Sequence, residues 1–174
     1  MSFYKIIDNF LTEQEYETLS NSILDKAFPW FWQESWTAES NDTPYFYHSF
    51  YDKNLPLSSH YELIENLFLK KLNAEVTISC RANLTLNFPI SYYSGHIDIR
   101  NITGNTTAVY YFDTTDAKTV FSHLGREIHV DSIKNRLLIF EGNTSHWLIG
   151  HTDDSKPRRV VLNLNYIERN ENII

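Results

Sequence analysis

The chain has 174 residues, of which 42% are hydrophobic, and its formal net charge is −7. This length and apolar content allow one domain with a hydrophobic core, and they argue against wholesale disorder. The acidic balance disfavours nucleic acid as a partner, because a negatively charged protein does not attract phosphate backbones. The single cysteine excludes an intrachain disulfide and a structural zinc site built from several thiolates.

The sequence contains no signal peptide and no apolar stretch long enough to span a membrane. We therefore expect a cytoplasmic protein without a membrane partner, and the sequence leaves its oligomeric state open.

Seven histidines are present. Because thiolate ligands are scarce, any transition-metal site in this chain must be built from imidazole and carboxylate groups.

The N-terminal third is predicted to be mainly helical. Thr12 and Glu15 form a capping box, which marks the start of a helix with an apolar stripe on one side. The aromatic-rich segment 27–36 predicts a strand or an irregular core wall, and a second helix is expected over 58–71. Residues 1–75 are thus expected to be a helical and aromatic region that supports the remainder of the domain.

After residue 75 the hydrophobic period changes from 3.6 to 2. Apolar and polar residues alternate without a break from Val76 to Phe88, which predicts a long strand with two chemically different faces. Further short strands separated by turn-like segments predict a β-sandwich or a β-barrel. The expected strands are 95–99, 107–112, 119–121, 127–133, 136–140 and 159–167.

A pair of potential metal ligands lies in the expected strand 95–99. His96 and Asp98 would share one face of this strand, about 7 Å apart at the backbone. Together with a distant histidine they would form the two-histidine, one-carboxylate ligand set of mononuclear non-haem iron(II). His146 and His151 are both candidates for the third ligand. The pair alone is a weak signal, since hydrogen-bonded strand residues produce the same pattern.

The last expected strand carries a polar face. Its alternation places Arg159, Asn163 and Asn165 on one side, opposite Val160, Leu162 and Leu164. An arginine inside a barrel needs an anionic partner, and a dicarboxylate would supply one. The alternative is that this face lies in solvent. The same two interpretations apply to Asn83, which lies on the polar face of the long strand and could contact substrate or cosubstrate.

Five segments, in order, resemble the catalytic core of the iron(II)/2-oxoglutarate-dependent oxygenases, in particular the prolyl-4-hydroxylase-like branch. They are Gly-His-Ile-Asp (95–98), Thr-Ala-Val-Tyr-Tyr-Phe-Asp (107–113), Thr-Val-Phe (119–121), Asn-Arg-Leu-Leu-Ile-Phe (135–140) and Arg-Val-Val-Leu-Asn-Leu-Asn-Tyr (159–166). The opening segment 5–11, followed by a capped helix, is also typical of that branch. The resemblance implies one α+β, mainly β oxygenase domain over 1–174. Its core would be a double-stranded β-helix, or jelly roll, over 76–168, with N-terminal supporting helices.

The resemblance also assigns roles to single residues. It implies His96, Asp98 and His146 as iron ligands, and it favours His146 over His151 because of the spacing from the strand 136–140. Arg159 would bind the distal carboxylate of 2-oxoglutarate, assisted by Tyr111 and Thr119. The remaining pocket residues would be Asn83, Asn163, Asn165 and His151.

Two departures from the family pattern concern the cosubstrate pocket. The usual Gly-Gly turn before Thr119 is replaced by Asp-Ala-Lys at 116–118, and Val161 occupies the serine position of the Arg-x-Ser signature. These departures imply a somewhat different pocket, not a loss of activity.

The resemblance further implies the cofactor Fe(II), the cosubstrates 2-oxoglutarate and O₂, and the products succinate and CO₂. The substrate would be a prolyl or other peptidyl residue that becomes hydroxylated. A free amino acid or small metabolite is the alternative, so the expected partner is a peptide, a protein or a small molecule. A non-catalytic jelly-roll binding or structural protein is the alternative of another class.

Overall fold

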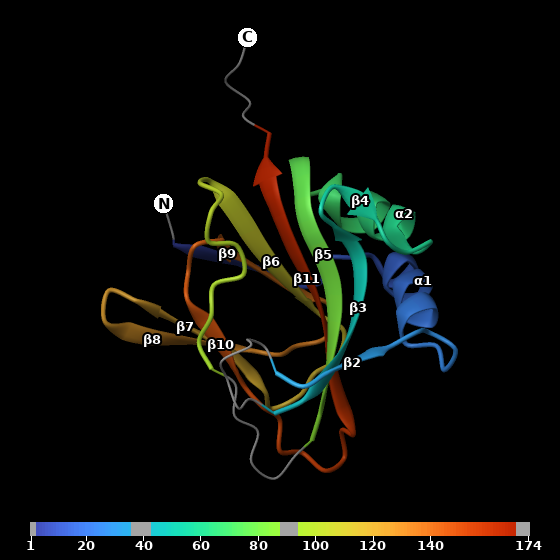
Figure 1. Ribbon diagram of the computed structural model, residues 1–174. Coiled ribbons are helices and arrows are strands. Elements are labelled where there is room, and N and C mark those ends of the chain that lie inside the picture. Colours follow the sequence, from blue (N-terminus) through green and yellow to red (C-terminus); the bar gives the residue numbers. More distant parts are fainter. Residues whose placement is uncertain (1–2, 36–42, 88–93, 170–174) are drawn as a thin grey trace.

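A computed structural model describes residues 3–35, 43–87 and 94–169, in which two antiparallel sheets face one another (Figure 1). The large sheet has eight strands in the order β1-β9-β6-β11-β5-β3-β2, with β4 paired to β3, and the small sheet has the order β10-β7-β8. The large-sheet strands are β1 (Tyr4–Ile7), β2 (Phe31–Gln33), β3 (Tyr45–Asp52), β4 (Leu55–Pro56), β5 (Ala74–Leu86), β6 (Asn105–Tyr111), β9 (Arg136–Glu141) and β11 (Arg158–Glu168). The small-sheet strands are β7 (Lys118–His123), β8 (Arg126–Asp131) and β10 (His146–Ile149).

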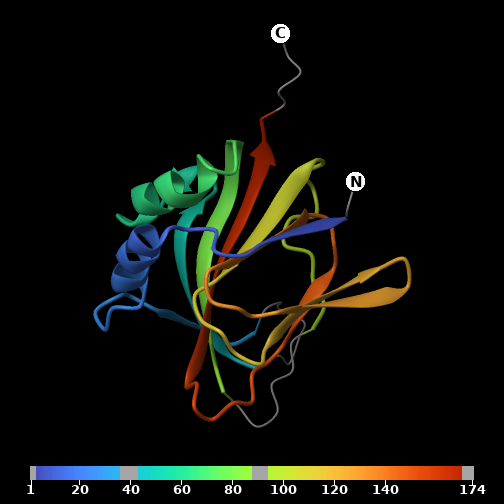
Figure 2. The ribbon, with the colours of Figure 1, turned by 180° about the vertical axis from the view of Figure 1, so that it is seen from behind.

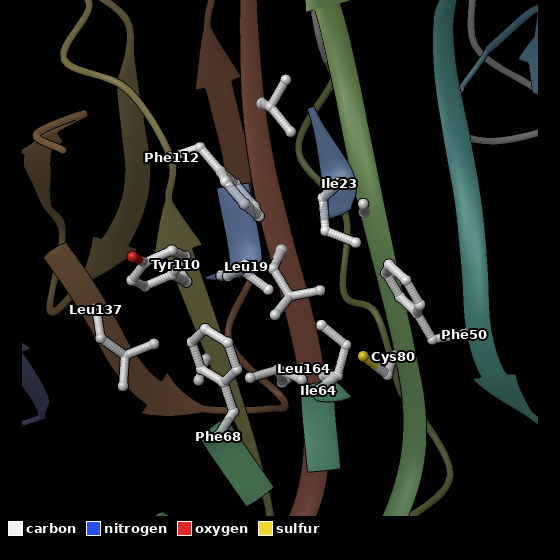
Figure 3. Packing of buried hydrophobic residues seen from close by; sticks show 14 of the residues in the cluster. Leu19, Ile23, Phe50, Ile64, Phe68, Cys80, Tyr110, Phe112, Leu137 and Leu164 are labelled. Atoms are coloured by element: carbon white, nitrogen blue, oxygen red, sulfur yellow. The ribbon is translucent and has the colours of Figure 1, made fainter. Parts of the chain in front are cut away.

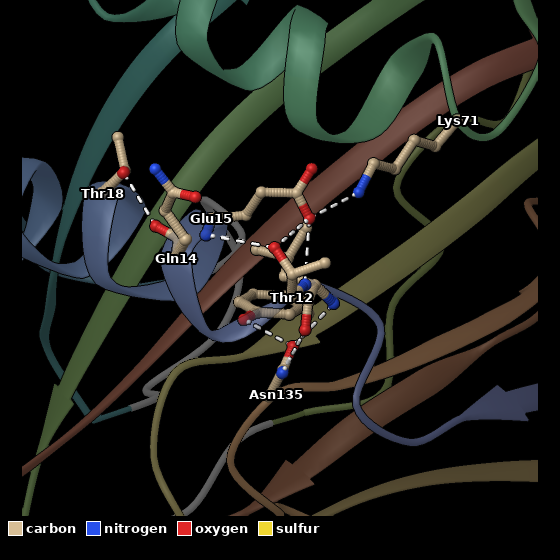
Figure 4. A network of polar contacts seen from close by, with 8 residues as sticks. Thr12, Gln14, Glu15, Thr18, Lys71 and Asn135 are labelled. Atoms are coloured by element: carbon tan, nitrogen blue, oxygen red, sulfur yellow. Dashed lines mark hydrogen bonds and ion pairs between the residues drawn. The ribbon is translucent and has the colours of Figure 1, made fainter.

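The first helix, α1 (Glu13–Ile23), begins where the capping box predicts it (Figure 4). The Glu15 backbone N–H donates to the Thr12 hydroxyl, and the Thr12 backbone N–H donates to the Glu15 carboxylate, at 3.3 and 2.9 Å. Lys71 Nζ lies 2.7 Å from the same carboxylate. This ion pair connects the start of α1 to the end of the second helical segment. That segment, expected over 58–71, consists of the short α2 (Tyr61–Ile64) and a π-helical turn over Glu65–Leu69.

The helices cover one face of the large sheet. Alternate residues of β5 and β11 point toward them, as the period-2 pattern predicts, and contribute Cys80 and Leu164 to the main core (Figure 3). Leu19 and Ile23 of α1 and Phe68 of the π-helical turn close this core from the helical side. Burial of these apolar side chains fixes the helices on the sheet.

The small sheet packs against the opposite face of the large sheet (Figure 2). A second apolar cluster lies between the two sheets and contains Tyr111 of β6, Phe121 of β7, Phe140 of β9 and Val161 of β11. The polar side chains that alternate with the helix-facing residues of β5 and β11 therefore point into the space between the sheets. This arrangement confirms the mainly β fold class with a jelly-roll core.

The structure corrects two expectations. The first third of the chain is not mainly helical, because β1, β3 and β4 also come from it and lie in the large sheet, while β2 lies in the segment 27–36 where a strand or an irregular core wall is expected. The segment 95–99 is not a regular strand, since its only ladder contact among the described residues is an isolated bridge between His96 and His146. Trp36 and Phe88, at the ends of two expected segments, lie outside the described residues. Across the ranges that the structure describes, no helix is both long and apolar enough to cross a membrane.

Candidate metal centre

Backbone hydrogen bonds bring the two candidate histidines together. The N–H of His96 donates to the carbonyl of His146, and the N–H of His146 donates to the carbonyl of His96, both at 2.9 Å. A glycine precedes His96 at this close approach, and a Cβ atom on Gly95 would lie 3.3 Å from Ser145 Oγ. His146 begins β10, which pairs with β7, so the bridge attaches the 94–99 segment to the small sheet.

The side chains of His96, Asp98 and His146 converge, and one ligand atom from each lies within 4.8 Å of the others. Asp98 Oδ1 lies 3.3 Å from His96 Nε2 and 3.9 Å from His146 Nε2. Each imidazole directs Nδ1 at a backbone carbonyl, that of Ser94 at 3.3 Å and that of Thr144 at 3.1 Å. A carbonyl only accepts, so Nδ1 carries a proton in each ring, and Nε2 faces the centre of the cluster. Nε2 would present its lone pair to a metal ion once its own proton is lost. Two imidazole nitrogens and one carboxylate oxygen in this orientation fit a non-haem iron(II) site.

The carboxylate of Asp98 is held from its other side. Its Oδ2 accepts hydrogen bonds from Asn163 Nδ2 at 2.8 Å and from Asn165 Nδ2 at 3.3 Å, which leaves Oδ1 facing the histidines. Burial raises the pKa of Asp98, but the His96 hydrogen bond and the His146 charge outweigh burial and lower this pKa well below its ordinary value. Asp98 is therefore an ionised carboxylate with a fixed orientation, as a metal ligand must be.

His151 does not join this cluster. It is fully buried, and its Nε2 donates to the carbonyl of Lys156 at 3.0 Å. Among the described residues, the group that could hold a metal ion contains His146 and not His151. The structure thus brings together the same three residues that the family resemblance implies.

A buried guanidinium lies in the cavity next to this cluster. The cavity is lined by His96 and His146 together with Asn83, Thr119, Arg159 and Asn163. Arg159 is only 5% exposed, so the interpretation that its strand face lies in solvent is wrong. Asn83, Asn163 and Asn165 are buried as well.

Neutral groups orient the Arg159 guanidinium. Its Nε donates to Ser132 Oγ at 3.0 Å, its Nη2 donates to Thr119 Oγ1 at 3.4 Å, and its Cζ lies 5.4 Å from the centre of the Tyr111 ring. The Tyr111 hydroxyl also donates to Thr119 Oγ1, at 2.8 Å. Since Thr119 Oγ1 accepts two hydrogen bonds, its own hydroxyl hydrogen can point to a ligand oxygen. A guanidinium beside such a hydroxyl suits a carboxylate.

Sequence reasoning missed two features of the site. Ser132, a contact of Arg159, falls within an expected strand whose pattern gives it no special role. The hydrogen bonds from Asn163 and Asn165 to Asp98 were missed as well, because the sequence placed these amides in the pocket without a partner.

Comparison with known proteins rests on structure. No protein-family model matches the sequence, and no curated protein does. A Burkholderia pseudomallei oxidoreductase of the 2OG-Fe(II) oxygenase family matches 97% of this chain and 86% of its own, with a TM-score of 0.72 at 11% identity. A Trichoplax adhaerens prolyl hydroxylase, solved with a hypoxia-inducible-factor peptide, matches 95% of this chain and 84% of its own, with a TM-score of 0.67 at 15% identity. The α-ketoglutarate-dependent carbocyclase SnoK matches 95% of this chain and 79% of its own, with a TM-score of 0.65 at 13% identity. The chain therefore has the fold of the 2-oxoglutarate/iron(II) oxygenases.

Proposed function

We propose that this protein is an iron(II)- and 2-oxoglutarate-dependent dioxygenase that hydroxylates a C–H bond of its substrate. One observation carries the proposal. The two histidines of the His96, Asp98 and His146 cluster line the same cavity as the buried Arg159 guanidinium, so the donor set that Fe(II) requires lies beside the charge that a dicarboxylate requires. A purely structural jelly roll has no need to bury these groups together, because burying charged groups is costly.

Different residues of the site would bind the metal, bind the cosubstrate and exclude water. Iron(II), when bound, supplies the chemistry that couples conversion of 2-oxoglutarate and O₂ into succinate and CO₂ to hydroxylation of the substrate. His96, Asp98 and His146 would hold the metal. Arg159 would pair with the distal carboxylate of 2-oxoglutarate, and the Thr119 hydroxyl would donate to the same group. Apolar neighbours in the cavity, Val109, Leu148 and Val161, exclude water from the reacting groups.

The resemblance favours a prolyl or other peptidyl residue as the substrate, and a free amino acid or small metabolite is the second candidate. Proteins of similar fold include both a peptide-bound prolyl hydroxylase and a carbocyclase from nogalamycin biosynthesis. The cytoplasmic location and the organisation of residues 1–174 as one oxygenase domain are part of the same proposal.

Anaerobic addition of Fe(II) and 2-oxoglutarate to the purified protein tests the activity. We expect a weak visible charge-transfer band that is lost in His96→Ala. His129→Ala is the matched control, because His129 is an exposed histidine on β8 paired with Glu127 and lies outside the ligand cluster. Absence of the band in metal-replete wild-type protein would overturn the proposal, and so would an unchanged band in His96→Ala.

A further inference from the structure

A second cavity borders the metal centre. Its volume is about 220 Å³, and both Asp98 and Asn163 line it. Asn163 also lines the cavity that contains Arg159, so the two cavities meet at this side chain. Strands β3 and β5 contribute further polar groups to the lining, among them Ser49, Asp52, Ser79 and Arg81. The second cavity is therefore polar and next to the ligand carboxylate, and the proposed function assigns nothing to it.

Opposite charges lie in the lining of this cavity. Arg81 is half-buried, its Cζ lies 5.5 Å from the centre of the Tyr47 ring, and its side chain lies beside that of Tyr45. In the part of the chain that the structure describes, no carboxylate lies within ion-pair distance of Arg81. Its forked N–H groups suit a carboxylate. Asp52 supplies a negative charge in the same lining and suits an ammonium group.

A buried amide oxygen indicates a donor on the ligand. Asn163 donates through Nδ2 to Asp98, which fixes the orientation of its amide group. Its Oδ1 is buried and has no hydrogen-bond partner among the described residues. A buried acceptor without a partner is costly, and a donor on a molecule bound in either of the two cavities that Asn163 lines would satisfy it.

We propose that the second cavity binds the substrate and that this substrate is a small zwitterion of the free α-amino acid type. Its carboxylate would pair with Arg81, and its ammonium group would face Asp52 and Asn163 Oδ1. The inference rests on the proposed function, because the neighbouring metal centre must perform the hydroxylation. The cavity is smaller than the roughly 300–1,000 Å³ of pockets for drug-sized ligands, which favours a small molecule. A residue inside a peptide has neither a free carboxylate nor a free ammonium at its backbone.

Substrate-stimulated succinate formation tests the proposal. The standard L-amino acids are compared with their primary amides, with their N-acetyl forms and with N-acetylated peptide amides. We expect at least one free amino acid to stimulate succinate formation and both of its blocked forms to lose most of this effect. Arg81→Leu should raise the half-maximal concentration of that amino acid about tenfold or more. Arg81→Lys should recover part of this loss, and Arg126→Leu, on the exposed surface of β8, should change nothing.

A binding measurement separates this inference from the proposed function. The Fe(II)/2-oxoglutarate band should form normally in Arg81→Leu, which also shows that this variant is folded. Calorimetric binding of the stimulating amino acid to metal-free protein should weaken in Arg81→Leu and not in Arg126→Leu. If the band forms in the wild type, three results overturn the inference alone. These are stimulation by blocked peptides and not by free amino acids, no stimulation by any free amino acid, or stimulation and binding that do not change in Arg81→Leu. If the band does not form in the wild type, the proposed function itself has failed.

Discussion

The hydrogen bond from Asn163 to Asp98 leads to a quantitative prediction about metal affinity. In Asn163→Leu, a side chain of similar size replaces the amide, so the 2.8 Å hydrogen bond to Asp98 Oδ2 is lost. The substitution also removes the buried Oδ1 that has no partner among the described residues. We therefore expect a folded protein whose Asp98 carboxylate is held less firmly.

The size of the effect follows from the geometry. A hydrogen bond to a charged group contributes about 1.5–3 kcal/mol. Asn165 keeps its own hydrogen bond to the same oxygen, but this bond is longer, at 3.3 Å, and the same amide nitrogen also contacts Ser79 Oγ. The remaining contact should compensate only partly, which points to the lower end of the range. Because about 1.4 kcal/mol corresponds to a factor of ten, we expect Fe(II) affinity to fall about tenfold, within the span found when partners of metal ligands are removed.

Anaerobic titration of metal-free protein with Fe(II), at saturating 2-oxoglutarate, measures this affinity through the visible band. Asn66→Leu is the matched control, since Asn66 is an exposed asparagine in the π-helical turn. An Fe(II) affinity of Asn163→Leu within about twofold of the wild-type value would refute the reasoning, because Asp98 would then be positioned without this amide.

Three further predictions concern stability and the cosubstrate pocket. Thr12→Ala removes the capping hydroxyl of α1 and should lower the free energy of unfolding by about 1 kcal/mol in chemical denaturation; an unchanged unfolding midpoint would contradict this role. Phe68→Ala leaves a cavity in the main core, where Phe68 is fully buried, and should lower the free energy of unfolding by about 3–5 kcal/mol in the same assay. A decrease below about 1 kcal/mol would show that packing in this core does not hold the helices on the sheet. Arg159→Leu should raise the 2-oxoglutarate concentration needed for the visible band about tenfold or more, with Fe(II) binding retained, whereas Arg158→Leu should not. The opposite result would mean that the other face of β11 carries the anchor.

Local patterns predicted a large part of the fold. The capping box gave the start of α1, and uninterrupted alternation gave the long strand β5 and the two faces of β11. The sequence did not predict strands β1 and β3, because they are defined by pairing with β9 and β5, which are distant in the sequence. The segment 95–99 alternates like a strand, yet outside its bridge at His96 it has no ladder partner among the described residues. Hydrophobic period shows which residues share a face, but it does not show whether a neighbouring strand is there to pair.

For the candidate site, the sequence by itself determined the chemical types and one local spacing. His96 and Asp98 lie two residues apart, and Arg159, Asn163 and Asn165 share one face of β11, because side chains of an extended chain alternate. Only the tertiary structure placed His146, and not His151, beside His96 and Asp98, since this placement depends on the bridge between His96 and His146. Only the structure showed that Asn163 and Asn165 hold Asp98, that Ser132 orients Arg159, and that Arg81 and Asp52 line one cavity. These contacts join segments that are far apart in the chain, and strand pairing within the large sheet and packing between the two sheets bring them together, which no local pattern encodes.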